Sequence, residues 1–144
     1  MLRNGNWSNG MADTKTRNDE RCFCCGSKND RGLKLSFSYP EEGRAETSLT
    51  IPEYFTGWED LTHGGLISML LDETMAHACL SRGTPGVTAE LTVRFKKPLP
   101  VESIVSVQGR TTEVRGRTAA TEGQIQGSDG TVYATARAKF FISA

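Results

Sequence analysis

One stretch of this chain, LISMLLDETMAHACL (residues 66–80), constrains the fold most, because it alone has the composition of a long helix. It contains strong helix formers and no internal Gly or Pro, and Gly83 just beyond it is typical of a helix C-terminus. Its apolar residues cover nearly every direction around a helix axis, as in helices that are buried on all sides. We therefore expect the rest of the chain to wrap around this helix.

The remaining sequence indicates strands separated by turns. Polar and apolar residues alternate, as expected for strands, over residues 34–39, 45–51, 87–99, 103–114, 118–127 and 131–142. The order is then two strands, one helix and four antiparallel strands. This predicts an α+β protein with an antiparallel sheet of five to six strands around one central helix.

Length and charge limit the possible classes. The 144 residues suit one domain, which we place at 21–144, after a polar segment at 1–20 that is expected to be disordered, with Met11 as an alternative native start. Lys plus Arg equals Asp plus Glu at 17 each, which gives no reason to expect a nucleic-acid or membrane partner. No apolar run reaches the ~20 residues of a membrane span. Without a signal pattern, the chain is predicted to be cytoplasmic.

Three of the four cysteines are crowded into the sequence CFCCG. The cysteines are Cys22, Cys24, Cys25 and Cys79. The first and third form a CxxC pair that resembles half of a zinc site, but a closed site needs four ligands and no second CxxC exists. The only histidines are His63 and His77. We therefore expect free buried thiols and no bound metal.

Two adjacent carboxylates, Asp72 and Glu73, interrupt the apolar helix. Burying a carboxylate costs several kcal/mol unless it is paired or protonated, so such groups usually specify a structure or perform chemistry. Neighbouring helical residues point about 100° apart, so one acid can face a site while the other pairs elsewhere. The alternative is that both acids bind N–H groups or arginines at an interface.

The sequence HGG (residues 63–65) directly precedes this helix. Glycines at a helix N-terminus leave backbone N–H groups open, and the helix dipole is positive there, which suits a developing oxyanion. An ordinary glycine-rich turn is the alternative. Gly65 and Asp72 are seven residues apart, about 10 Å along one helix. If both act on one atom, Asp72 must come from a second copy of the chain, related by a two-fold axis.

Three blocks of sequence together resemble a known family. They are CFCCGSKNDRGLKLSF (22–37), THGGLISMLLDETM (62–75) and GVTAELTVRFKKPLP (86–100), in this order. The chain resembles the hotdog-fold acyl-CoA thioesterases of the PaaI-like, or 4-hydroxybenzoyl-CoA, type over residues 22–142. The resemblance implies a hotdog fold, hydrolysis of an acyl-CoA without metal or cofactor, and homodimers that often pair into tetramers.

The resemblance also implies roles for individual residues. Asp72 matches the acid that acts as nucleophile or general base, and Gly65 matches the glycine whose N–H polarises the thioester carbonyl. His63 matches the histidine that fixes this loop. Thr88 matches a Ser/Thr position that assists from across the dimer. Glu73 is the alternative acid, although the spacing favours Asp72, whose pKa burial should raise.

Coenzyme A brings phosphates, for which Arg and Lys are suitable partners. The basic clusters near strand ends are Arg94, Lys96 and Lys97, and Arg115 with Arg117. Alternatively, these side chains are solvated residues that protect strand edges and hairpin tips from pairing.

One departure from the family pattern keeps a second function open. Many members carry Asn or Gln six residues before the histidine, where this chain has Gly57. Either another group orients the carbonyl, or the turnover is poor. The same departure keeps open a protein that binds acyl-CoA without catalysis. A hotdog hydratase or dehydratase is disfavoured by the HGG block. Aryl, phenylacetyl and medium-chain acyl groups all remain possible substrates.

Overall fold

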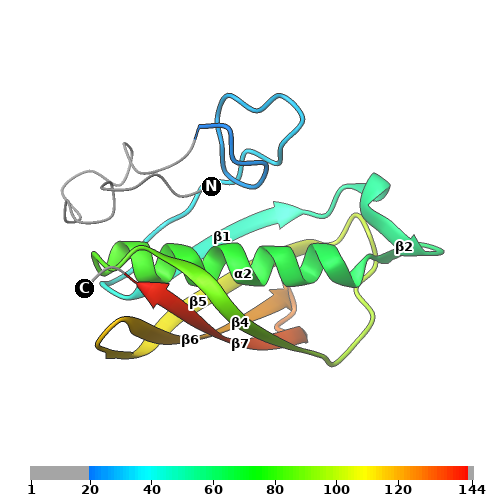
Figure 1. Cartoon of the computed structure of the whole chain (residues 1–144). Helices are drawn as coiled ribbons and strands as arrows, with labels where there is room; N and C mark the ends of the chain where they lie inside the picture. Colours follow the sequence, from blue (N-terminus) through cyan, green and yellow to red (C-terminus); the bar gives the residue numbers. More distant parts are fainter. Residues whose placement is uncertain (1–19, 143–144) are drawn as a thin grey trace.

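The computed structural model describes residues 20–142, so the predicted tail at 1–20 lies almost entirely outside the described residues. The elements are β1 (Arg44–Thr50), the 3-10 turn η2 (Glu53–Phe55), β2 (Thr56–Trp58), β3 (Leu61–Thr62), α2 (Gly64–Ser81), β4 (Gly86–Phe95), β5 (Ile104–Arg115), β6 (Thr118–Gly127) and β7 (Val132–Ile142). The main sheet has the order β1-β5-β6-β7-β4 and is antiparallel throughout, while β2 and β3 form a separate hairpin (Figure 1). The predicted α+β architecture, with five strands and one long helix, is confirmed.

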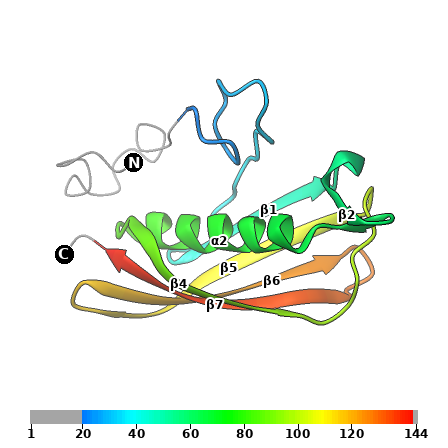
Figure 2. The same cartoon turned by 45° about the vertical axis from the view of Figure 1, so that its right-hand side comes forward.

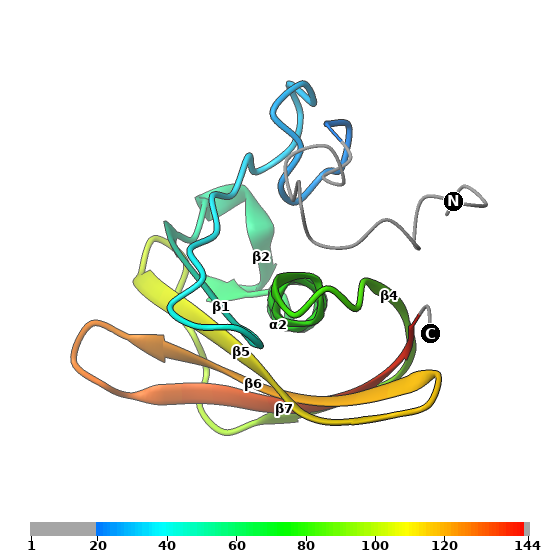
Figure 3. The same ribbon diagram turned by 90° about the vertical axis from the view of Figure 1, so that its left-hand side faces the viewer.

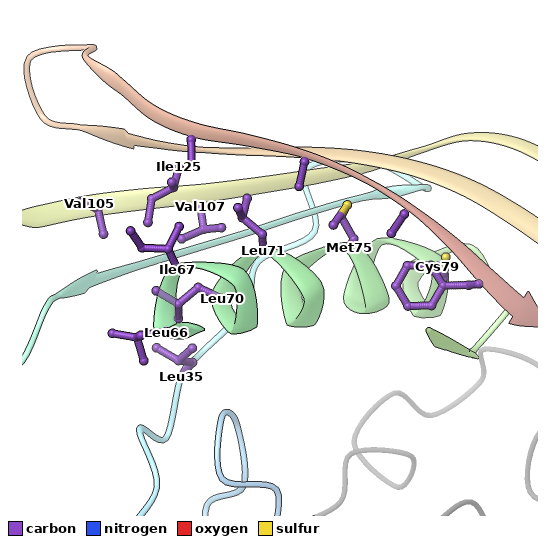
Figure 4. Packing of buried hydrophobic residues seen from close by; sticks show 14 of the residues in the cluster. Leu35, Leu66, Ile67, Leu70, Leu71, Met75, Cys79, Val105, Val107 and Ile125 are labelled. Carbon is purple, nitrogen blue, oxygen red and sulfur yellow. The ribbon is translucent and has the colours of Figure 1, made fainter. Parts of the chain in front are cut away.

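The helix α2 lies between the sheet and an irregular N-terminal segment. The sheet curves under one side of the helix, and residues 20–37 lie on the opposite side (Figures 2 and 3). Leu71 and Met75 of α2 pack towards Val107 and the other sheet residues, whereas Leu35 packs on the far side (Figure 4). The helix is therefore enclosed as predicted, but the sheet alone does not enclose it.

The strand predicted at 34–39 is wrong. This segment makes only an isolated bridge, between Ser38 and Glu46, before β1. Its backbone is used differently, because the amide of Leu35 donates to the carbonyl of Cys24 at 2.9 Å and Lys34 has a positive φ of 52°. The CFCCG loop thus takes the hydrogen bonds that a strand partner would need. The sequence also gave no indication of the short β2–β3 hairpin.

The helix rests directly on the backbone of the sheet. Ala45, Gly109, Gly123 and Ala136 lie side by side across β1, β5, β6 and β7. A Cβ atom at Gly109 would lie 3.0 Å from the carbonyl oxygen of Thr74 in α2. A row of small residues therefore lets α2 approach the middle of the sheet closely.

Both ends of α2 are capped. At the C-terminus, the amides of Arg82 and Gly83 donate to the carbonyls of Cys79 and Leu80, and Gly83 has the left-handed φ of 82° that glycine tolerates. This confirms the predicted end of the helix.

None of the helices in the described part of the chain combines the length and apolar character that a bilayer span requires.

Candidate active site

The HGG sequence forms a tight cap at the start of α2. The Nδ1 atom of His63 accepts a hydrogen bond from the N–H of Gly65 at 2.8 Å. The N–H that the sequence predicted to be open is therefore occupied by the histidine ring. A Cβ atom at Gly65 would lie 2.9 Å from the same Nδ1 atom, so only glycine fits under the ring.

The hairpin β2–β3 lies against this cap. A Cβ atom at Gly57 would lie 3.0 Å from Cα of His63 and 3.2 Å from its ring atom Cδ2. An Asn or Gln side chain at this position would push against the histidine. Because Gly57 has no side chain, the β2–β3 hairpin can pack directly against His63.

A cavity of about 550 Å³ opens beside the cap. Ile67, Phe95 and Leu99 give it an apolar surface, and Lys96 and Lys97 add two cations. Its other lining residues are Gly57, Trp58, Leu61, Thr62, His63, Gly64 and Pro98. The cavity can take an apolar group next to the positive end of a helix.

Sequence reasoning missed the contribution of Trp58 to this cavity. The side chain is 73% exposed, although tryptophan usually buries much of its surface. It lies at the turn between two strands of three and two residues, which are too short to produce a clear alternating pattern. The signal present in the sequence is a tryptophan five residues before the HGG segment.

Asp72 forms a pair with Thr88. The Thr88 hydroxyl donates to Oδ1 of Asp72 at 2.6 Å. Burial raises the pKa of Asp72, the nearby charge of Glu73 raises it further, and the Thr88 hydrogen bond opposes both effects. The irregularity in β4 between Thr88 and Glu90 is a place where a strand can redirect a side chain. The Thr88 contact lies within one chain, whereas the resemblance implied that it came from the partner.

Glu73 points to a different region of the molecule. Its Oε1 atom lies 3.2 Å from Sγ of Cys25 and 3.3 Å from Nε2 of His77. The two adjacent acids therefore diverge, as the helical geometry predicted. Glu73 contributes neither to the cavity lining nor to the Asp72–Thr88 pair.

Asp72 does not line the cavity beside its own helix N-terminus. The outer strand β4 offers a way to bring the two together, since β4 ends the sheet and pairs only with β7 within residues 20–142. Thr88 lies near the start of β4 and the cavity residue Phe95 lies at its end. Two β4 strands paired antiparallel across a two-fold axis would place Thr88 of one chain towards Phe95 of the other.

The five basic residues predicted to contact phosphates are not together. Only Lys96 and Lys97 line the cavity. Arg94 lines a second hollow, beside Arg110 and Arg137 of the sheet. Arg115 binds Glu113 at 2.8 Å on the β5–β6 hairpin.

That hairpin lies at the other end of β4. Thr118 at its tip pairs with Phe141, and Phe141 pairs with Val87 near the start of β4, about 25 Å along the strand from Phe95. Arg115 and Arg117 therefore do not reach the cavity of their own chain, and the two predicted basic clusters lie at opposite ends of β4.

Comparisons with known proteins identify relatives of this chain. The sequence model of the thioesterase superfamily matches residues 60–134. Human acyl-coenzyme A thioesterase THEM5 is 28% identical over 98 residues, which are 67% of this chain and 40% of that protein. Human acyl-coenzyme A thioesterase 13 is 29% identical over 108 residues, or 69% of this chain and 71% of that protein. The chain therefore spans less than half the length of THEM5.

Solved structures agree with the sequence comparison. The crystal structure of a thioesterase superfamily protein, RHA08564, has a TM-score of 0.80 and 25% identity, covering 85% of this chain and 60% of the other. The Escherichia coli PaaI protein has a TM-score of 0.72 and 22% identity, covering 76% of this chain and 83% of PaaI. These likenesses confirm the hotdog fold, with one long helix on an antiparallel sheet.

Proposed function

The chain belongs to the thioesterase superfamily, and on this basis we propose that it hydrolyses an acyl-CoA thioester to a carboxylic acid and CoA. The cavity at the start of α2 is the observation that carries this proposal. It combines an apolar surface for an acyl group, a helix N-terminus for a carbonyl oxygen, and Lys96 and Lys97 for the phosphates of CoA.

In the proposed mechanism, the Gly65 N–H exchanges its histidine partner for the thioester carbonyl. His63 holds this N–H in place before substrate arrives, at 2.8 Å. The carbonyl then sits at the positive end of the helix, where negative charge that develops on its oxygen is stabilised. His63 is a positioning residue in this scheme.

Asp72 supplies the base or the nucleophile. As a base it would take a proton from water that attacks the carbonyl; as a nucleophile it would attack directly and form a mixed anhydride, which water then hydrolyses. Its raised pKa makes it a better base than an ordinary carboxylate, and Thr88 fixes its orientation. Since thioesters are reactive, one carboxylate and one N–H dipole suffice without metal or cofactor.

We further propose that each site combines two chains. The outer edge of β4 supports this, because within residues 20–142 this ten-residue strand is paired only on its β7 side, and its free edge, with exposed Val87 and Phe95, is a template for pairing. In the resulting homodimer, the partner's Asp72 approaches the cavity beside the N-terminus of α2, which His63 and Gly64 line and Gly65 adjoins. This arrangement would also bring Arg115 and Arg117 of one chain towards the CoA end of the other. Further pairing of dimers into a tetramer remains part of the proposal.

The first test compares two neighbouring carboxylates. Asp72→Asn should lower kcat on a panel of aryl, phenylacetyl and medium-chain acyl-CoA substrates by about 10²–10⁴-fold, measured as thiol release with a dye. Glu73→Gln should keep far more activity, because Glu73 faces the cysteine loop. Equal activity of wild type and Asp72→Asn would remove Asp72 from its role, and a greater loss in Glu73→Gln would reassign the acid.

The second test addresses the shared site. Asp72→Asn and Gly65→Ala, the latter placing a methyl against His63, should each be inactive alone. When they are mixed and allowed to exchange subunits, about half of the dimers contain one intact site of two, so about a quarter of wild-type activity should return. Mixed dimers that form without recovering activity would show that each site lies within one chain.

The panel of acyl-CoA substrates also tests a second candidate function, namely acyl-CoA binding without hydrolysis. The occupied Gly65 N–H and the Gly57 substitution favour a protein that binds acyl-CoA without turnover. Tight acyl-CoA binding by calorimetry, together with no thiol release from any substrate, would support this binding function over the hydrolase.

A further inference from the structure

Five side chains of metal-binding type gather between the cysteine loop and α2, on a different face of the helix from Asp72. They are Cys22, Cys24 and Cys25 of the CFCCG loop, and Glu73 and His77 one helical turn apart. Their ligand atoms form two groups, Cys22–Cys24–Glu73 and Cys25–Glu73–His77, and within each group all atoms lie within 4.8 Å of one another. Glu73 belongs to both groups and is therefore the centre of the cluster.

The distances from Glu73 to the other three proposed ligands are close to those of a tetrahedral site, although Cys22 belongs to a different group from Cys25 and His77. Oε1 of Glu73 lies 3.2 Å from Sγ of Cys25, 3.8 Å from Sγ of Cys22 and 3.3 Å from Nε2 of His77. Around a zinc ion with bonds of about 2.3 Å to sulfur and 2.0–2.1 Å to nitrogen or oxygen, tetrahedral ligand atoms are about 3.3–3.8 Å apart. Cys25, Glu73 and His77 thus already lie at ligand spacing, and rotation of the Cys22 side chain towards Cys25 and His77 would complete a set of four around one ion.

His77 is already oriented as a metal ligand. Its Nδ1 atom lies 2.8 Å from the Tyr39 hydroxyl, and its ring stacks on Phe37 with centroids 3.8 Å apart. Metal-binding histidines usually engage their second ring nitrogen in such a hydrogen bond, which fixes the tautomer and the ring orientation. The other nitrogen, Nε2, then faces Glu73 and the thiols.

The cysteine loop is tightly folded against the helix. The Gly26 amide donates to the Cys22 carbonyl at 2.8 Å, and a Cβ atom at Gly26 would lie 2.6 Å from that carbonyl oxygen. Among the four ligands, Cys25 and His77 are buried and Cys22 and Glu73 are half-buried, and the buried Cys24 covers the cluster on the loop side. Closed sites with four protein ligands are structural, whereas catalytic zinc sites keep an open position.

We propose that Cys22, Cys25, Glu73 and His77 bind one zinc ion, which fastens the N-terminal loop to α2. The sequence predicted free thiols because it contains only one CxxC pair. The fold supplies the two missing ligands from a helix about fifty residues further along the chain. Zinc is chosen because a set of thiolate, imidazole and carboxylate ligands in tetrahedral arrangement suits it best. The site is separate from the proposed chemistry at Asp72.

The test uses the full chain, reduced and stripped of metal with a chelator, then titrated with Co²⁺ under anaerobic conditions. Binding should saturate at one ion per chain, produce a thiolate-to-cobalt charge-transfer band with tetrahedral visible bands, and be reversed by Zn²⁺. Zinc should also protect the site cysteines from thiol reagents and raise the thermal unfolding midpoint.

Variants then identify the ligands. Cys25→Ser and His77→Gln should abolish the cobalt spectrum, while Cys79→Ala, which removes a buried thiol outside the cluster, should retain it. Tyr39→Phe leaves all ligands in place and should weaken zinc affinity about 10–100-fold, as other losses of a histidine partner do. Because Tyr39 is 38% exposed, this variant remains informative if a ligand variant fails to fold.

Three results would overturn the proposal. They are a fully reduced chain that gives no cobalt–thiolate band, a disulfide between cluster cysteines as the form isolated under anaerobic conditions, and unchanged zinc affinity in Tyr39→Phe. Equal loss of the cobalt spectrum in Cys79→Ala and Cys25→Ser would likewise show that the effect comes from damage to the fold.

Discussion

The close approach of α2 to the sheet makes a sharp prediction about Gly109. Replacing Gly109 with alanine places a methyl 3.0 Å from the carbonyl carbon and oxygen of Thr74 and 3.1 Å from Cα of Met75, whereas ordinary contact begins near 3.4 Å. All three are helix backbone atoms, so no side chain can rotate away. The helix and the sheet must separate by a few tenths of an ångström at the centre of the core.

The expected size of this effect follows from two opposing terms. Overpacking a core costs about 1–3 kcal/mol. Removing the flexibility of glycine from the unfolded chain returns about 0.4–1 kcal/mol. Gly109→Ala should therefore lower the free energy of unfolding by about 1–2 kcal/mol. At about 3–4 °C per kcal/mol for a chain of this size, Tm should fall by about 3–8 °C.

Urea unfolding followed by circular dichroism, together with thermal scans at one protein concentration, measures this change. Gly127→Ala is the matched control, because the atoms nearest to a Cβ there belong to the side chains of Tyr133 and Asp129, which can rotate, and the glycine also lies in a strand. The control should be neutral or slightly stabilising. A Gly109→Ala protein as stable as the wild type would refute the close packing of α2 on the backbone of β5.

Three further predictions concern the site. Because the pKa of Asp72 is raised in the folded chain, its ionised form opposes folding, and Asp72→Asn should be more stable than wild type at pH 7. In denaturant titrations, this difference in the free energy of unfolding should shrink as the pH falls towards 3.8. A difference that grows in acid would contradict the raised pKa. Thr88→Ala removes the hydrogen bond that lowers the Asp72 pKa, so the acidic limb of the kcat/KM profile should move to higher pH; an unmoved limb would separate Thr88 from the base. Lys97→Ala should raise KM for acyl-CoA about two- to fivefold with little change in kcat, and the difference should disappear at high salt; a salt-independent loss would point to altered packing.

The sequence predicted those parts of the molecule that depend on local pattern. The long apolar run without Gly or Pro identified α2 to within two residues at its start, and alternation identified the five strands of the sheet. The same alternation failed at 34–39, because the backbone of Leu35 bonds the cysteine loop. Local patterns do not reveal which distant segment takes the hydrogen bonds of a strand.

In the candidate site, too, local features were predicted from the sequence and contacts between distant segments were not. The positions of His63 and Gly65 at the helix start followed from sequence, and so did the divergence of the two acids. The Gly65 N–H was expected to be open, but the histidine ring turns back onto it. The neighbours of Glu73 are separated from it by about fifty residues, and only the folded chain shows that they meet. The cytoplasmic location stays a prediction.

The order of the strands has a practical consequence for anyone who trims this chain to its recognisable part. The family signature ends at residue 134, three residues into β7, and it begins after β1. Among the described residues, β4 pairs with the sheet only through β7, so a protein cut at residue 134 would keep Thr88 on a strand that has lost most of its partner strand. It would also lose Phe140, which is fully buried. The segment that matches the family is thus shorter than the folded unit. A stable fragment should extend through Ile142.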